Sequence, residues 1–162
     1  MGDQIGLKIN EDGTTEWVTW DQGDSLPVLQ EGVGGTVDAV GLTEDVDMWL
    51  HDEGLFRYGV NPTATRLARL HDKTHQPYYG PVIITGQHDG VTLGLTREAQ
   101  AWLTAWVAGR CTAIDEREGE AAHCGSDYSH PGRTHQSIVR GERWIWHGQP
   151  THTLAEITGA LQ

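Results

Sequence analysis

Residues 110–135 are the segment that most restricts how this chain can fold. The stretch is polar, rich in Gly, His and acidic residues, and its few apolar residues follow neither helical nor strand spacing. Such a segment cannot bury enough apolar surface to offset the entropy lost on ordering its backbone. It is therefore either a polar loop or a segment ordered by something other than a hydrophobic core, such as a metal ion.

Four potential metal ligands occur in this stretch with the spacing C-x12-C-x5-H-x4-H: Cys111, Cys124, His130 and His135. Zinc prefers four tetrahedral ligands, and thiolate with imidazole is a common set. Pro131-Gly132 predicts a tight turn that would bring the last two rings to one ion. Binding would contribute about 10 kcal/mol or more. Because four protein ligands leave no position for water, we expect Zn²⁺ to be structural here, and no catalytic residue is assigned.

The ligand set has alternatives. The chain has nine His, so chance clustering of two ordinary thiols with scattered imidazoles is the competing interpretation. His123 or His147 could also replace one of the proposed His ligands. The same stretch resembles a small Cys/Cys/His/His module of actinobacterial and actinophage proteins, in which a Trp follows the last His, as Trp144 does here. Ser129 stands where that module usually has Gly, and the resemblance implies metal binding without specifying a task.

The chain before residue 109 has the patterns of an ordinary folded domain. Short β-leaning runs predict strands over Gln4–Ile9, Thr15–Trp20, Thr36–Val40, Val46–Leu50, Leu55–Tyr58, Val82–Thr85 and Val91–Leu95. The first two are separated by Glu11-Asp12-Gly13, which predicts a hairpin. The run Val82–Thr85 is continuously β-branched or apolar and suits a buried strand.

Three helices are predicted among these strands. Ser25 is expected to cap the first, with Leu26 and Leu29 facing inward and Gly32 at its end. Asn61-Pro62 predicts the start of the second, and the third follows Thr96 and ends at Gly109. A hairpin over Gln136–Arg140 and Arg143–His147 and a short helix through Leu154, Ile157 and Leu161 are expected near the end of the chain.

The predicted fold is α+β: a small mixed or antiparallel sheet with two to three short helices, followed by a zinc-stabilised β-rich tail. The domains are expected over 1–109 and 110–162. Residues 29–100 also resemble the uncharacterised DUF3846 family. The residues that carry the resemblance are Leu29-Gln30, Val33–Val40, His51–Leu55, Asn61–Thr65 and Tyr79–Gly86. It implies a small α/β domain common in phages, plasmids and other mobile elements, and it implies no reaction.

The formal charge of −12 disfavours a role in tracking phosphates or anionic membranes. Residues 1–107 carry 16 acidic and 6 basic side chains, so the expected domain is the acidic part. No apolar run reaches a membrane span, and Met1-Gly2-Asp3-Gln4 does not resemble a signal peptide, so we expect a cytoplasmic protein of a bacterial host cell. The sequence is compatible with a homo-oligomer as well as with a monomer.

The first functional hypothesis is a non-enzymatic accessory protein of a phage or mobile element, with a possible counter-defence role. It would bind a host protein or sequester a small host molecule. Interface anchors, if exposed, would be Trp17, Trp20, Trp49, Tyr78 and Tyr79, although most of the Trp residues are expected in the core. Alternatives are an acidic DNA mimic that inhibits a DNA-binding protein, or nucleic-acid binding through the zinc tail and its nearby Arg residues.

Two further alternatives concern individual residues. Catalysis would require His71 and His75, one helical turn apart, or the pair His88-Asp89. Asn61 could instead head an anion site at the start of its helix, although an architectural role is favoured.

Overall fold

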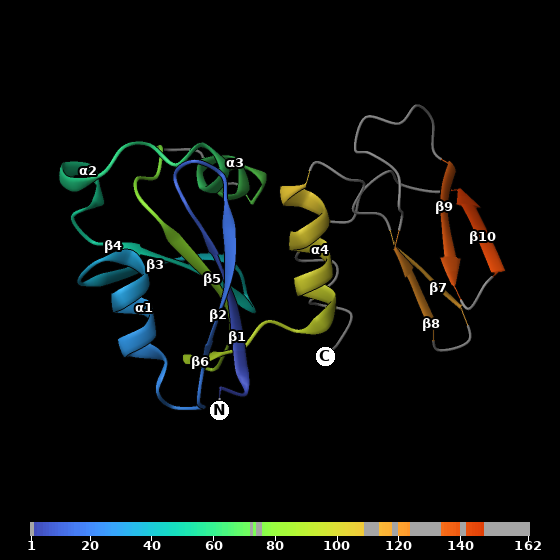
Figure 1. The fold of residues 1–162 in the computed structure, drawn as a ribbon, viewed down its shortest axis with the longest axis horizontal. Helices are drawn as coiled ribbons and strands as arrows, with labels where there is room; N and C mark the ends of the chain where they lie inside the picture. Colours follow the sequence, from blue (N-terminus) through green and yellow to red (C-terminus); the bar gives the residue numbers. More distant parts are fainter. Residues whose placement is uncertain are drawn as a thin grey trace. The chain divides into compact units, whose positions relative to one another are not determined.

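The computed structural model describes residues 2–71, 73, 76–108, 114–117, 120–123, 134–139 and 142–147. The chain forms two compact units, Met1–Thr96 and Arg97–Gln162. The first unit is an α+β domain built on a six-stranded antiparallel sheet (Figure 1). The predicted boundary at residue 109 stays a prediction. None of the described helices is long and apolar enough to cross a bilayer.

The strand order in this sheet is β2-β1-β5-β4-β3, with β6 paired to β5. The strands are β1 (Gln4–Ile9), β2 (Thr15–Trp20), β3 (Val37–Thr43), β4 (Val46–His51), β5 (Val82–His88) and β6 (Val91–Leu93). The predicted burial of the β-branched run is confirmed, because the first five residues of β5 are buried, and the structure adds that β5 lies between β1 and β4. The late strand thus joins two hairpins that are separate in sequence.

The hairpin of β1 and β2 follows the sequence prediction residue for residue. Asn10 donates its backbone N–H to the carbonyl of Thr14, and Gly13 donates to the carbonyl of Asn10. Gly13 has φ +86°, the left-handed conformation that ends a three-residue hairpin loop with a bulge. This loop fixes the register, in which Gly6 lies opposite Val18.

Helix α1 (Ser25–Val33) starts and ends differently from the prediction. Asp24 is the N-cap residue and makes no side-chain capping bond, so the expected cap by Ser25 is wrong. Leu29 and Val33 are buried, whereas Leu26 is 52% exposed, which corrects its predicted inward position. The helix continues one residue beyond Gly32 because Gly34, at φ +87°, supplies the left-handed C-cap.

Helix α3 (Pro62–Leu70) begins as predicted, at the Asn61 cap followed by proline. The Asn61 side chain is buried and accepts the N–H of Ala64 at 3.0 Å. Its amide donates to the carbonyls of Ile9 and Gly80 at 3.0 and 2.9 Å. The residue therefore joins α3, β1 and the segment before β5, and its role is architectural.

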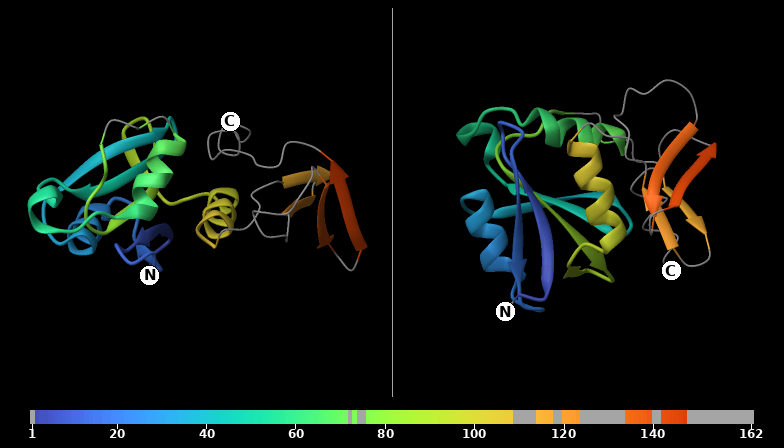
Figure 2. Two further views of the ribbon diagram at one scale, coloured as in Figure 1. Left: turned by 90° about the horizontal axis from the view of Figure 1, so that it is seen from above. Right: turned by 45° about the vertical axis from the view of Figure 1, so that its right-hand side comes forward.

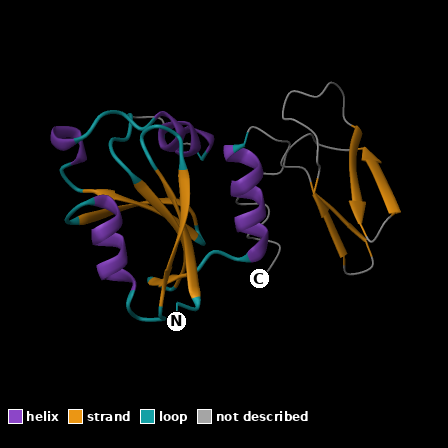
Figure 3. Cartoon of the chain, viewed as in Figure 1, coloured by secondary structure: helices purple, strands orange, loops and turns teal. Residues whose placement is uncertain are grey.

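Residues 54–57 form a short helix, α2 (Gly54–Arg57), where a strand was predicted. The ring Nδ1 of His51 accepts the N–H of Glu53 at 2.9 Å and stabilises the preceding turn. Arg57 returns to Glu53, four residues earlier, with a 3.0 Å ion pair that requires helical spacing. Figure 3 shows α2 at the rim of the unit with loop on both sides.

The second unit contains helix α4 (Arg97–Val107) and two antiparallel hairpins. The first hairpin pairs β7 (Ile114–Arg117) with β8 (Glu120–His123), and the second pairs β9 (Thr134–Val139) with β10 (Glu142–His147). The predicted hairpin near residue 141 is thus confirmed. The predicted helix through Leu154, Ile157 and Leu161 lies outside the described residues.

Candidate functional site

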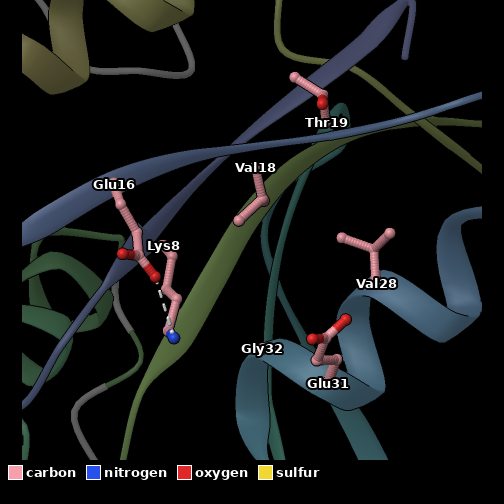
Figure 4. A pocket seen from close by; sticks show the side chains of 7 residues that line it. All are labelled: Lys8, Glu16, Val18, Thr19, Val28, Glu31 and Gly32. Carbon is pink, nitrogen blue, oxygen red and sulfur yellow. Dashed lines mark ion pairs between the residues drawn. The ribbon is translucent and has the colours of Figure 1, made fainter. Parts of the chain in front are cut away.

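A groove with a volume of about 440 Å³ lies between the outer strand β2 and helix α1. In two views α1 runs beside β2 (Figure 2). The sheet and the helix both contribute to the lining (Figure 4), which consists of Lys8, Glu16, Val18, Thr19, Val28, Glu31 and Gly32. None of these residues is fully buried, so the groove is open along its length.

The packing of α1 explains why this part of the sheet is left uncovered. Leu29 and Val33 pack on Ile83 of the central strand β5, which holds the helix over the middle of the sheet. A Cβ atom on Gly32 would collide with Cδ1 of Ile83, so glycine allows the helix to approach closely at this point. The next face of the helix, with Val28 and Glu31, then borders the space above β1 and β2.

The groove has an excess of one negative charge. Lys8 Nζ lies 3.1 Å from Glu16 Oε1, and their side chains are 20% and 57% exposed. A pair this exposed contributes at most about 1 kcal/mol, so its carboxylate can be shared with a second cation. Glu31 is exposed and has no ion-pair partner among the described residues. A guest with a positive charge would therefore meet two carboxylates.

The backbone of β2 provides a second kind of binding group. Asn10 bonds to Thr14, and hydrogen-bonded pairs alternate along an antiparallel ladder, so Lys8–Glu16 and Gly6–Val18 are also bonded pairs. The peptide groups of Thr15, Trp17 and Thr19 therefore point away from β1. These three residues are exposed, and β2 ends the strand order. The outer edge of β2 can thus accept another strand.

Of the predicted interface anchors, Trp17 alone is exposed, at 44%. Trp20 and Tyr78 are buried at 3% and 1%, so they do not meet the condition of exposure, and Trp20 is a core residue as expected for most of the Trp side chains. Trp49 and Tyr79 are half-buried, and the Trp49 indole donates to Thr85 Oγ1 at 2.9 Å.

Sequence reasoning missed Phe56, which is the most exposed aromatic side chain among the residues with a described environment, at 85%, beside Leu55 at 60%. The signal that could have found it is the Glu53–Arg57 spacing of four, which suits an exposed helical turn that carries Leu55 and Phe56.

Of the four proposed metal ligands, the structure describes only His135, and only as a position in a strand. Cys111, Cys124 and His130 lie outside the described residues. His135 is in β9 opposite Trp146, and its side chain is not described. The alternative ligands His123 and His147 are the last residues of β8 and β10. Within the described part of the chain, no three His, Cys, Asp or Glu side chains gather as a metal site would require.

The structure describes only one of the two residue pairs suggested for catalysis in full. Helix α3 ends at Leu70, so it does not continue through His71, whose Nδ1 lies 2.9 Å from the carbonyl of Leu67. His75 lies outside the described residues. His88 Nε2 is 3.4 Å from Asp89 Oδ2, but these side chains are 68% and 90% exposed. A pair so exposed to water does not form an enclosed site in which a substrate would be held.

Comparison with known proteins gives one match. Residues 5–108 match the family described as "Domain of unknown function (DUF3846)". No curated protein and no solved structure matches the chain. The matched range contains every residue of the groove.

Proposed function

The chain belongs to the DUF3846 family, and from this premise we propose that it is a non-enzymatic binding protein of a phage or mobile element that engages a host protein. The observation that carries the proposal is the groove beside β2, in which exposed backbone, two carboxylates and apolar side chains adjoin one another. Strand edges and open grooves of this kind are surfaces that other polypeptides recognise.

Exposed apolar side chains support a protein partner. Phe56 and Leu55 are adjacent on α2, and Trp17 is exposed on β2. Large aromatic side chains dominate the binding energy of many protein interfaces. A sequestered small molecule is favoured less, because small-molecule sites bury most of their ligand and this groove has no fully buried lining residue.

Acidity supports a second candidate, a DNA mimic that occupies the basic groove of a DNA-binding protein. Residues 1–60 contain thirteen acidic side chains, of which ten are exposed and none is buried. Carboxylates on a rigid surface can compete with phosphates for such a groove. Binding to a restriction enzyme or nucleoid protein that weakens steeply with salt would favour this candidate over the first.

For the C-terminal part we propose one structural zinc ion held by Cys111, Cys124, His130 and His135. The antiparallel pairing of β7 and β8 supports this, because the chain enters and leaves that hairpin at one end. In sequence, one proposed thiolate precedes this hairpin and the other follows it directly. Nucleic-acid binding through this part remains an alternative that filter binding would test.

Elemental analysis of the full chain tests the zinc site. We expect one zinc per chain and a lower melting temperature after chelation, with both effects lost in Cys124→Ser. His135→Gln should reduce zinc content, whereas His147→Gln should not. A chain without stoichiometric metal that melts identically after stripping would refute the site.

Site-specific photo-crosslinking tests the binding function. A benzophenone amino acid at position 56 should capture a single host protein from an extract of the bacterial host. A second chain with the crosslinker at Val91, which is 52% exposed outside the groove and α2, provides the control. Equal capture from both positions, or capture from neither, would contradict a defined protein interface.

A further inference from the structure

The groove and the outer edge of β2 together specify one kind of guest. We propose that this protein binds an extended, basic segment of its partner by strand addition to β2, with an Arg or Lys side chain in the groove between Glu16 and Glu31. The inference deepens the proposed function by naming the place and the chemistry of the contact, and it rests on that function.

The backbone supplies the first reason. The peptide groups of Thr15, Trp17 and Thr19 point outward from the sheet, and within the described part of the chain no recorded backbone bond uses them. An extended segment beside β2 would pair with these groups, as in other complexes in which a peptide extends a sheet. The exposed β2 residues carry neither a proline nor a lysine that would block such pairing.

The alternation of side chains supplies the second reason. Residues of an added strand would alternate between the α1 side of the sheet, where Val18 and the groove lie, and the other side, where Trp17 is exposed. One set of guest side chains would thus enter the groove, and the other would cover the indole. An apolar side chain suits the second position because it would bury part of the exposed indole surface.

Charge supplies the third reason and determines the type of guest. The carboxylate of Glu31 projects from α1 on the helix side of the groove, and Glu16 projects from β2 on the sheet side (Figure 4). Lys8 neutralises one of them, which leaves room for a single additional positive charge. A guanidinium or ammonium group on a long apolar stem matches both the carboxylates and the apolar walls formed by Val18 and Val28.

Labelled peptides provide the test with the full chain. The probe is a fluorescent eight-residue peptide that alternates Arg and Val, measured by anisotropy. Control probes replace Arg with Glu, or methylate alternate backbone nitrogens. We expect the Arg–Val peptide to bind with a Kd below about 1 mM, and both control peptides to bind at least tenfold more weakly, because they lose the charge match or the strand pairing.

Variants locate the binding. Glu31→Lys should weaken the Arg–Val peptide at least tenfold, whereas Glu44→Lys, at an exposed site outside the groove, should change it less than twofold. Thr19→Pro removes an outward N–H without removing a bond to β1, so it should abolish binding while circular dichroism remains unchanged. Trp17→Ala tests the opposite side of the strand without altering the backbone and should weaken binding at least threefold.

Several results would overturn the inference. These are no peptide binding, equal binding of the Arg and Glu peptides, or binding insensitive to both Glu31→Lys and Trp17→Ala. A dimer in sedimentation that Thr19→Pro dissociates would show that a second copy occupies the edge. A partner captured from position 56 but indifferent to Glu31→Lys would leave the proposed function intact and refute this site alone.

Discussion

The two faces of the central sheet differ in what they bury. On one face Leu7, Ile84 and Met48 form a row across three adjacent strands, and all are at most 2% exposed. On the other face, the adjacent row runs from Lys8 through Ile83 to Trp49. The first row is wholly apolar, whereas the second begins with a charge and ends with an indole that donates to a buried hydroxyl.

The apolar face therefore contributes mainly to stability, whereas the α1 face leaves groups available for binding. A continuous apolar row contributes free energy in proportion to the area removed from water, and it leaves no group for a ligand to recognise. The α1 face gives up part of that area, because the helix covers the middle of the sheet and leaves Lys8, Glu16 and Val18 beside a groove. Substitutions should therefore have large effects on one face and small or conditional effects on the other.

The largest effect is expected at the centre of the apolar face. Met48→Ala should lower the free energy of unfolding by about 3 kcal/mol, because the side chain is 0% exposed and its removal leaves a cavity. Urea denaturation followed by circular dichroism measures this change. Val91→Ala, at a half-exposed position, should cost less than about 0.5 kcal/mol. Equal costs at the two positions would break the comparison.

An intermediate effect is expected at the C-terminal end of α1. Gly34→Ala should cost about 1–2 kcal/mol, because an L-residue is strained at φ +87° and the new Cβ would collide with the Tyr58 hydroxyl. That hydroxyl donates to the carbonyl of Val33 at 3.1 Å, so the same change disturbs the helix end. Gly23 is also left-handed, but a Cβ atom there would have no neighbour within 4 Å. Comparing the thermal melting of Gly34→Ala with that of Gly23→Ala therefore separates the collision from the backbone strain.

The smallest effect is expected at Asp47 on β4, in the α1-facing set of residues. Burial raises the pKa of Asp47 above its usual value of 3.8. The ionised form therefore destabilises the fold above the raised pKa, and this penalty disappears as the pH falls through that pKa. Asp47→Asn should raise the melting temperature at pH 7 by no more than about 3 °C and leave it unchanged near pH 3. A gain that persists unchanged at pH 3 would exclude ionisation as its cause.

Local patterns in the sequence predicted several elements whose cause is local, although α2 is an exception. The hairpin of β1 and β2 was predicted because alternation and the Asp12-Gly13 turn both lie within seventeen residues. The start of α3 was predicted because Asn61 and Pro62 are themselves the capping residues. The family match over residues 5–108 confirms the resemblance found from these and similar motifs.

Features that depend on distant pairing were not predicted. The groove exists because β5, which begins at residue 82, inserts between β1 and β4 and leaves β2 at the edge. No local pattern specifies that order.

Two individual assignments from residue type were also wrong or incomplete. Leu55–Tyr58 was predicted as a strand because its residues favour extended backbone, but the contact of His51 with Glu53 starts a helix there instead. Trp20 was a candidate anchor by residue type, yet its indole lies beside Gly6 in the sheet.

The three hydrogen bonds of Asn61 have a consequence for the order of events during folding. Its partners are Ile9, 52 residues earlier, Gly80, 19 residues later, and Ala64 in its own helix. The Asn61 side chain can make all three hydrogen bonds only when β1, α3 and the segment before β5 have reached their native positions. We therefore expect the side-chain hydrogen bonds of Asn61 to form after the rate-limiting step of folding. Replacing Asn61 should then accelerate unfolding and hardly slow folding.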